Sequence, residues 1–217
     1  MQFKTASGVL ACTPDRLIVA GWTGRDRSAV DHHIEELAAI GVPAPSSVPL
    51  YYRCAPQLLT QAPMIQVLGD RSSGEAEPFL LKQDGVLWLG LASDHTDRAL
   101  ETYSVAYSKQ ACAKPVADML WRFDEVADHL DTLRLQSWIR EGDDWTAYQD
   151  GTLASILPLQ DLITGADLQD GTAMLCGTLP AIGGVRPAGT FKMTLTDPVF
   201  GRSIDWAYSS SLLEIVS

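Results

Sequence analysis

The feature that most constrains the fold of this chain is a Gln83-Asp84-Gly85 turn between two apolar runs, residues 79–81 and 86–91. An Asp-Gly step between such runs is a strong local signal for a β-hairpin. The two runs are therefore predicted to pair as strands. The residues that precede the first strand are then brought next to those that follow the second.

Three carboxylates stand at the open end of this predicted hairpin. Glu75 and Glu77 are one residue apart, so on an extended segment their side chains point to the same face. Asp94 follows Glu77 by 17 residues, which is enough for one hairpin return. Three acidic side chains without a thiol or imidazole suit a hard cation such as Mg²⁺ or Mn²⁺. The alternatives are a solvated edge strand for the glutamates and a helix cap for Asp94, with Arg98 in a surface ion pair.

Composition limits the partners of the chain. The 217 residues carry a formal net charge of −11, which disfavours nucleic acid and anionic membrane surfaces. The N-terminus lacks a signal-peptide pattern, and no apolar run approaches the ~18 residues that a membrane span needs. The cysteines are widely spaced without a CxxC pair, which favours reduced thiols in a cytoplasmic protein over a zinc site or disulfides. These cysteines are Cys12, Cys54, Cys112 and Cys176.

The remaining patterns predict one α+β, β-rich domain over residues 1–217. A proline-rich connector separates a small N-terminal portion, residues 1–49, from a β-rich core, residues 50–217. The N-terminal portion contains a helix that is expected to begin at Ser28 and to stop before Gly41. Further helices are expected at residues 99–109 and within 116–130. Further strands are expected at residues 17–22, 50–53, 64–68, 133–139, 174–176, 191–195 and 204–208.

Three other groups of residues could carry chemistry. His33 lies at the edge of the apolar stripe of its helix with Glu36 one turn further on, and a carboxylate beside an imidazole supports a general base. The alternative is a solvated helix flank. Lys114 stands at the expected start of a helix, where a cation is unfavourable, which suggests a role beyond that of a surface lysine. Gly177 and Thr178 follow an apolar strand and could hold a carboxylate, or could form an ordinary turn.

In their order along the chain, these motifs resemble the fumarylacetoacetate hydrolase superfamily. The family includes acylpyruvate hydrolases, oxaloacetate decarboxylases and 2-oxo-pent-4-enoate hydratases. The resemblance runs from about residue 20 to the C-terminus. It rests on an H-x-x-E motif, an E-x-E motif, an Asp with an Arg four residues on, a later Lys, a segment similar to Q-x-G-x-T and a Gly-Thr turn. These correspond to His33 with Glu36, Glu75 with Glu77, Asp94 with Arg98, Lys114, Gln149, and Gly177 with Thr178. The chain departs from the family pattern at Ser93, where an Asn is usual, and at Pro115, where a Ser is usual.

The resemblance implies a rolled mixed β-sheet, a homodimer and a lid formed by the N-terminal helix. It implies that Glu75, Glu77 and Asp94 hold Mg²⁺ or Mn²⁺, which stabilises an enolate of a small 2-oxo acid or 1,3-dicarbonyl substrate. Catalytic roles fall to four residues, and substrate binding to three. The catalytic residues are His33, Glu36, Lys114 and Arg98, and the substrate-binding residues are Gly177, Thr178 and Gln149. The implied reaction is hydrolytic cleavage of a carbon–carbon bond.

Other functions stay open at this stage. A decarboxylase or hydratase could use the same metal and lysine without water activation by His33. A non-catalytic small-molecule-binding protein could have the same fold. A cysteine-dependent enzyme is a further class, although the sequence has no GxSxG elbow, phosphate loop or dinucleotide fingerprint to support covalent or nucleotide chemistry.

Overall fold

The predicted hairpin, the central hairpin of the fold, lies in the interior of the six-stranded sheet, the largest sheet of the described residues. Its strands are β8 (Ala76–Gln83) and β9 (Val86–Ser93), which pair antiparallel with Ala76 opposite Ser93. The computed structural model describes residues 1–39 and 43–216. The six-stranded sheet has the strand order β12-β9-β8-β15-β3-β4. The other four strands are β12 (Trp121–Arg122), β15 (Thr172–Leu175), β3 (Arg16–Gly21) and β4 (Leu50–Cys54).

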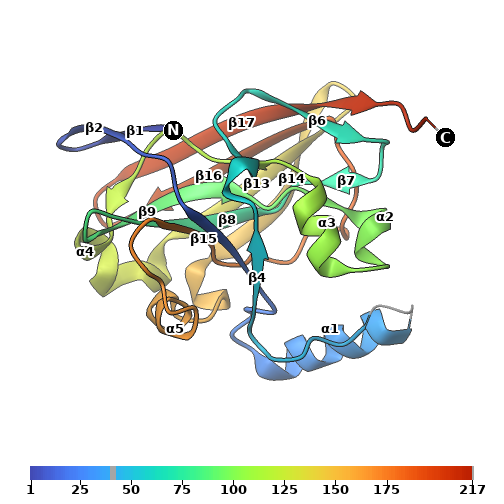
Figure 1. The fold of residues 1–217 in the computed structure, drawn as a ribbon, viewed down its shortest axis with the longest axis horizontal. Coiled ribbons are helices and arrows are strands. Elements are labelled where there is room, and N and C mark those ends of the chain that lie inside the picture. Colours follow the sequence, from blue (N-terminus) through green and yellow to red (C-terminus); the bar gives the residue numbers. More distant parts are fainter. Residues whose placement is uncertain (40–42, 217) are drawn as a thin grey trace.

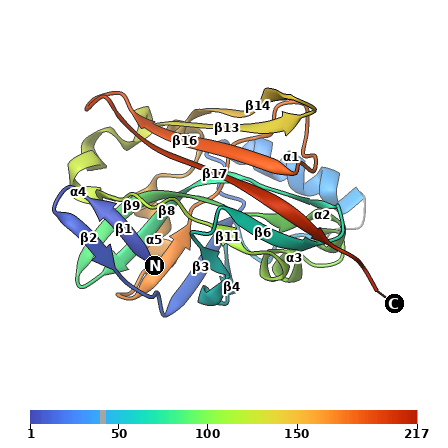
Figure 2. The same ribbon diagram turned by 90° about the horizontal axis from the view of Figure 1, so that it is seen from above.

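The second sheet lies over the first as a separate layer (Figure 2). Its order is β14-β13-β16-β17-β6, and only the β17–β6 pair is parallel. Its strands are β14 (Asp144–Thr152), β13 (Arg134–Glu141), β16 (Thr190–Asp197), β17 (Arg202–Leu213) and β6 (Met64–Leu68). The β-rich α+β prediction with mixed sheets is confirmed. The rolled form of the sheet is not shown, because the described strands of both sheets run in linear order.

Short elements complete the described chain and surround the sheets (Figure 1). The short strands are β1 (Gln2–Thr5), β2 (Gly8–Ala11), β5 (Leu59–Thr60), β7 (Ser72–Ser73), β10 (Thr96–Asp97) and β11 (Lys114–Pro115). The α-helices are α1 (Arg27–Ala39), α2 (Arg98–Glu101), α3 (Val105–Ala111), α4 (Phe123–Val126) and α5 (Leu159–Gly165). Short 3₁₀ helices cover Pro56–Leu58, Ala127–Thr132 and Leu153–Ser155.

The central hairpin is buried on both of its faces. Leu80 of β8 belongs to the apolar cluster that also contains Leu135 and Phe191 of the second sheet. The alternate residue, Phe79, belongs to a second cluster on the opposite face, which also contains Phe3 of β1. Full burial of a side chain of this size contributes about 1.5–3 kcal/mol relative to exposure. The hairpin is therefore a rigid platform for the side chains at its open end.

All the strands expected from apolar runs form, but the helices differ from the prediction. The first helix begins one residue earlier than expected, because Asp26 Oδ1, not Ser28, accepts hydrogen bonds from the first free N–H groups. The helix expected at residues 99–109 is two short helices, because the side chain of Ser104 caps a new one by accepting from Tyr107 N. The helix expected within residues 116–130 is the short helix α4, which follows β12 and leads into the 3₁₀ helix Ala127–Thr132. The strand β14 and the helix α5 were not predicted.

Helix α1 lies on the side of the molecule where α2 and α3 lie, as both views show (Figures 1 and 2). It is described as far as Ala39, so its predicted stop at Gly41 lies outside the described residues. Strand β3, from the N-terminal portion, is part of the six-stranded sheet.

All four cysteines are free thiols, as expected. Among the described helices, none has the length and apolar character needed to pass through a membrane.

Candidate metal centre

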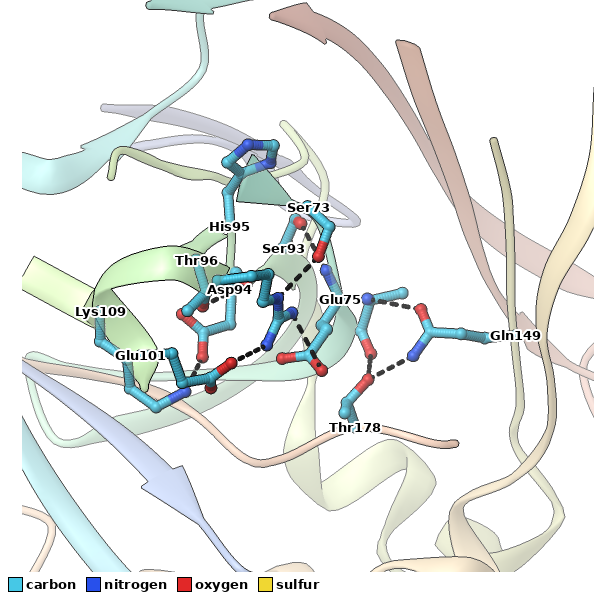
Figure 3. A network of polar contacts seen from close by, with 12 residues as sticks. Ser73, Glu75, Ser93, Asp94, His95, Thr96, Glu101, Lys109, Gln149 and Thr178 are labelled. Atoms are coloured by element: carbon cyan, nitrogen blue, oxygen red, sulfur yellow. Dashed lines mark hydrogen bonds and ion pairs between the residues drawn. The ribbon is translucent and has the colours of Figure 1, made fainter. Parts of the chain in front are cut away.

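The three predicted carboxylates come together at the open end of the central hairpin. Figure 3 shows two of them, Glu75 and Asp94, with the polar residues around them. One oxygen from each of Glu75, Glu77 and Asp94 lies within 4.8 Å of the others. The hairpin explains this, because Asp94 N donates a hydrogen bond to the Glu75 carbonyl at 2.9 Å, just beyond the paired strands. Ligands on opposite sides of a Mg²⁺ ion are about 4 Å apart. The three oxygens are therefore close to the spacing that one such ion requires.

Burial distinguishes this cluster from a solvated acidic edge. Glu77 is 2% exposed and Asp94 is fully buried. Burial, and then the neighbouring Asp94, raise the pKa of Glu77 well above its usual range. A buried pair of carboxylates is costly unless a cation accompanies it. The edge-strand alternative is thus excluded for Glu77, and the donor set fits a hard divalent ion.

The turn after β15 orients Glu77. Gly177 N donates a hydrogen bond to Glu77 Oε2 at 2.7 Å. The φ angle of Gly177 is +96°, and a Cβ at this position would lie 1.7 Å from the Thr23 hydroxyl oxygen. A glycine is therefore required here, both for its backbone conformation and for the close approach. The backbone N–H that was expected to hold a substrate carboxylate is engaged with a carboxylate of the chain itself.

Two lysines neutralise Asp94. Lys109 Nζ donates to Oδ2 of Asp94, and Lys114 Nζ lies 2.8 Å from its Oδ1 as an ion pair. Lys114 directs its hydrogen bond to the His95 carbonyl at 2.5 Å. Burial alone would raise the pKa of Asp94, but the two ammonium groups outweigh it and hold that pKa below its ordinary value. Asp94 is therefore an anion held by two buried cations, and it does not cap a helix.

Strand β11, not a helix start, positions Lys114. Strand β11 pairs in parallel with β5. The residues after β11 hydrogen-bond to β9, where Ala117 N donates to the Leu91 carbonyl. Lys114 is fully buried, so the surface-lysine alternative is excluded. Lys109 was missed, because its place on a short helix carries no local signal that its side chain turns inward.

Arg98 lies on the other side of the cluster. Its Nη2 is 3.2 Å from Glu75 Oε1, its Nη1 donates to Glu101 at 2.9 Å, and its Nε donates to the Ser73 hydroxyl at 2.7 Å. The alternative of a surface ion pair between Arg98 and Asp94 is therefore not what the structure has, because the described ion pairs of Arg98 are with Glu75 and Glu101. Asp97, not Asp94, caps α2 by accepting from two backbone N–H groups.

A buried amide links the second sheet to this site. Gln149 of β14 accepts from Ala76 N at 2.9 Å and from the Ser137 hydroxyl at 2.7 Å. Its Nε2 donates to the Thr178 hydroxyl at 2.5 Å, and that hydroxyl donates to the Ala76 carbonyl at 2.8 Å. Gln149 and Thr178 thus fix the backbone between the two glutamates, and Thr178 stays partly exposed.

The expected pair of His33 and Glu36 is not tested. The side chain of His33 lies outside the described residues, although its backbone is part of α1. The described ion pair on this face of the helix joins His32 Nε2 to Glu36 at 3.3 Å, with both side chains largely exposed.

His95 is a buried imidazole next to the carboxylates. Its two ring nitrogens lie 2.9 Å from the Tyr208 and Ser72 hydroxyls. Burial, and then the charges of Lys114 and Arg98, lower the pKa of His95 from 6.5 to about 3. The unfolded chain therefore binds a proton here between pH 6.5 and 3 that the folded chain does not, so stability falls as the pH decreases through this window.

We expect the His95→Gln substitution to remove part of this pH dependence. Between pH 7 and pH 5 the imidazole contributes about 2 kcal/mol to the change in the free energy of unfolding. Urea unfolding at both pH values, for the wild type and the variant, measures the difference. The carboxylates contribute to both proteins alike, so equal pH dependence in the two would contradict the burial of a neutral imidazole.

Several solved structures have the same fold as this chain. A putative fumarylacetoacetate isomerase/hydrolase from Oleispira antarctica superposes with a TM-score of 0.67 at 16% identity, over 98% of this chain and 100% of that one. A 2-keto-3-deoxy-D-arabinonate dehydratase complexed with magnesium and 2,5-dioxopentanoate gives 0.64 at 14%, over 94% and 75%. A 4-oxalocrotonate decarboxylase from Pseudomonas putida G7, complexed with calcium and acetate, gives 0.55 at 15%, over 90% and 76%. The chain thus has the fold of the fumarylacetoacetate hydrolase superfamily, which confirms the resemblance.

Sequence comparison gives one further match. The model of a family described as a protein of unknown function, DUF2848, matches residues 20–208. No curated protein matches the chain by sequence.

Proposed function

The chain belongs to the DUF2848 family, and we propose that it is a divalent-metal-dependent enzyme that hydrolyses a carbon–carbon bond in a small 2-oxo acid or 1,3-dicarbonyl substrate. The observation that carries the proposal is the cluster of the partly exposed Glu75 with the buried Glu77 and Asp94, with Lys114 behind it, on the fold of the fumarylacetoacetate hydrolase superfamily. The three carboxylates would hold Mg²⁺ or Mn²⁺. When bound, such an ion supplies Lewis-acid stabilisation of the enolate that develops as the bond breaks.

The basic residues of the site have distinct proposed roles. Lys114 keeps Asp94 ionised and fixes the segment through the His95 carbonyl. Arg98 holds the Glu75 carboxylate and adds positive charge at the edge of the cluster. Fixed charges of this kind stabilise a developing anion without reorganisation, because the protein has already oriented them.

Substrate binding is assigned to the turn after β15. The partly exposed Thr178 would contact the substrate carboxylate, while Gly177 orients Glu77 and the buried Gln149 orients Thr178. His33, with Glu36, would activate the water that attacks the distal carbonyl. We further propose a cytoplasmic homodimer, in which α1 closes over the site.

A decarboxylase or dehydratase is the second candidate, because two of the solved structures with this fold are named as such. These reactions share the carboxylate cluster and the lysine but do not need His33 to activate water. Retained turnover in His33→Ala would favour them.

The function is tested by turnover of three substrate classes with Mg²⁺ or Mn²⁺, each with a chelator control. Hydrolysis of an acylpyruvate yields pyruvate and a second acid, decarboxylation of oxaloacetate yields CO₂, and dehydration of a hydroxylated 2-oxo acid releases water without carbon loss. We expect metal-dependent formation of two acids and loss of activity in Glu77→Gln. Absence of metal-dependent turnover in all three classes would contradict the proposal and favour a non-catalytic binding protein. Inactivation by thiol alkylation would instead favour a cysteine-dependent enzyme.

A further inference from the structure

Lys109 brings a third cation to the three carboxylates. Its Nζ donates to Oδ2 of Asp94, and the side chain is 8% exposed (Figure 3). Asp94 is its nearest partner, and the charges of Glu75 and Glu77 also act on it. The ammonium thus contacts Asp94 and lies in the electrostatic field of the other two acidic groups that would hold a metal ion.

The other two cations of the site are differently placed. Arg98 shares its guanidinium between Glu75, Glu101 and the Ser73 hydroxyl. Lys114 is fully buried and fixed between Asp94 and the His95 carbonyl. With Glu101 counted, four acidic and three basic side chains therefore meet here, so the basic groups already offset most of the negative charge of the described site.

We propose that the ammonium of Lys109 is an internal cation that competes with the divalent metal for Asp94 and the two glutamates. The inference rests on the proposed function, because it concerns the same metal site. A divalent ion that binds the carboxylates brings two positive charges next to the ammonium, and like charges repel in a buried site. Metal binding therefore requires Lys109 to leave Asp94 Oδ2.

The geometry allows this movement. Lys109 is in the last turn of the short helix α3, and its ammonium is carried on a flexible four-carbon stem. The ring of Tyr52 has its centroid 5.8 Å from Nζ and offers an aromatic face to the displaced ammonium. Lys109 would thus keep the carboxylates assembled before metal binds and would set the affinity for the metal once it does.

Calorimetric titration with Mn²⁺ tests the competition. We expect Lys109→Met to bind Mn²⁺ at least tenfold more tightly than the wild type. The matched control is Lys4→Met, which removes an exposed ion pair with Asp118 and should leave the affinity within twofold of the wild type. Equal or weaker binding by Lys109→Met, with clear binding by the wild type, would overturn the competition and leave the metal site intact. Absence of binding in all three proteins would overturn both.

A second measurement uses the wild type alone and does not depend on the folding of the variant. Acylation of lysines by an amine reagent, read by mass spectrometry, should increase severalfold at Lys109 when Mn²⁺ is added, because its amino group leaves the buried ion pair. Labelling of Lys4 should not change. Unchanged labelling of Lys109 under conditions in which Mn²⁺ binds would overturn the inference.

Discussion

The Asp94→Asn substitution is expected to lower the free energy of unfolding by about 3–5 kcal/mol. Asp94 is fully buried and is the anion shared by Lys109 and Lys114. Asparagine has the same shape but no charge, so two ammonium groups would stay buried without their common partner. Breaking a buried ion pair from one side is far more costly than losing a surface pair. Urea unfolding of the metal-free protein at pH 7 measures the loss.

Asp118→Asn is the matched control for this experiment. Asp118 pairs with Lys4 at 2.7 Å with both side chains exposed, and its loss should change stability by less than about 1 kcal/mol. The double variant Asp94→Asn with Lys109→Met should be less destabilised than the two single changes added together, because each removes the partner of the other. A loss in Asp94→Asn no greater than that in the control would contradict the buried double ion pair.

The sequence was sufficient to predict where the three carboxylates lie. The Asp84-Gly85 turn and the two apolar runs determine a hairpin, and hairpin register then places Glu77 and Asp94 at the same end. Because side chains two residues apart on an extended segment point to the same face, Glu75 lies on the same side as Glu77. These are local rules, and they held because the hairpin is buried on both faces and its register is strongly specified.

The residues that surround the carboxylates depend on contacts far apart in the chain. The Ser104 cap breaks the predicted helix and begins α3, and only the packed position of α3 turns Lys109 toward Asp94. Likewise, Gln149 contacts Ala76 because two sheets pack face to face. The spacing of residues along the sequence predicts neither arrangement, because both depend on tertiary packing, which overrides local preference. The pairing of His33 with Glu36 stays a prediction.

The Glu77→Gln substitution is expected to remove metal binding while leaving the protein folded. Glutamine has the same shape and still accepts the hydrogen bond from Gly177 N, but it is a poor ligand for a hard cation. Loss of a residue that only hydrogen-bonds to a metal ligand lowers the affinity for the metal ~10–100-fold. Loss of the ligand Glu77 itself should lower the affinity for Mn²⁺ by more than this. Burial raises the pKa of Glu77, which means that its charge is costly in the metal-free protein. The metal-free variant should therefore be at least as stable as the wild type in urea unfolding, which separates loss of a ligand from loss of the fold.

Mn²⁺ titration of the wild type and Glu77→Gln, followed by calorimetry at pH 7, tests the metal centre most directly. Binding of one ion per chain to the wild type, with none detected in a folded Glu77→Gln variant, is the predicted result. Equal affinity in the two proteins would contradict a site formed by these three carboxylates, as would a wild type that binds no divalent ion.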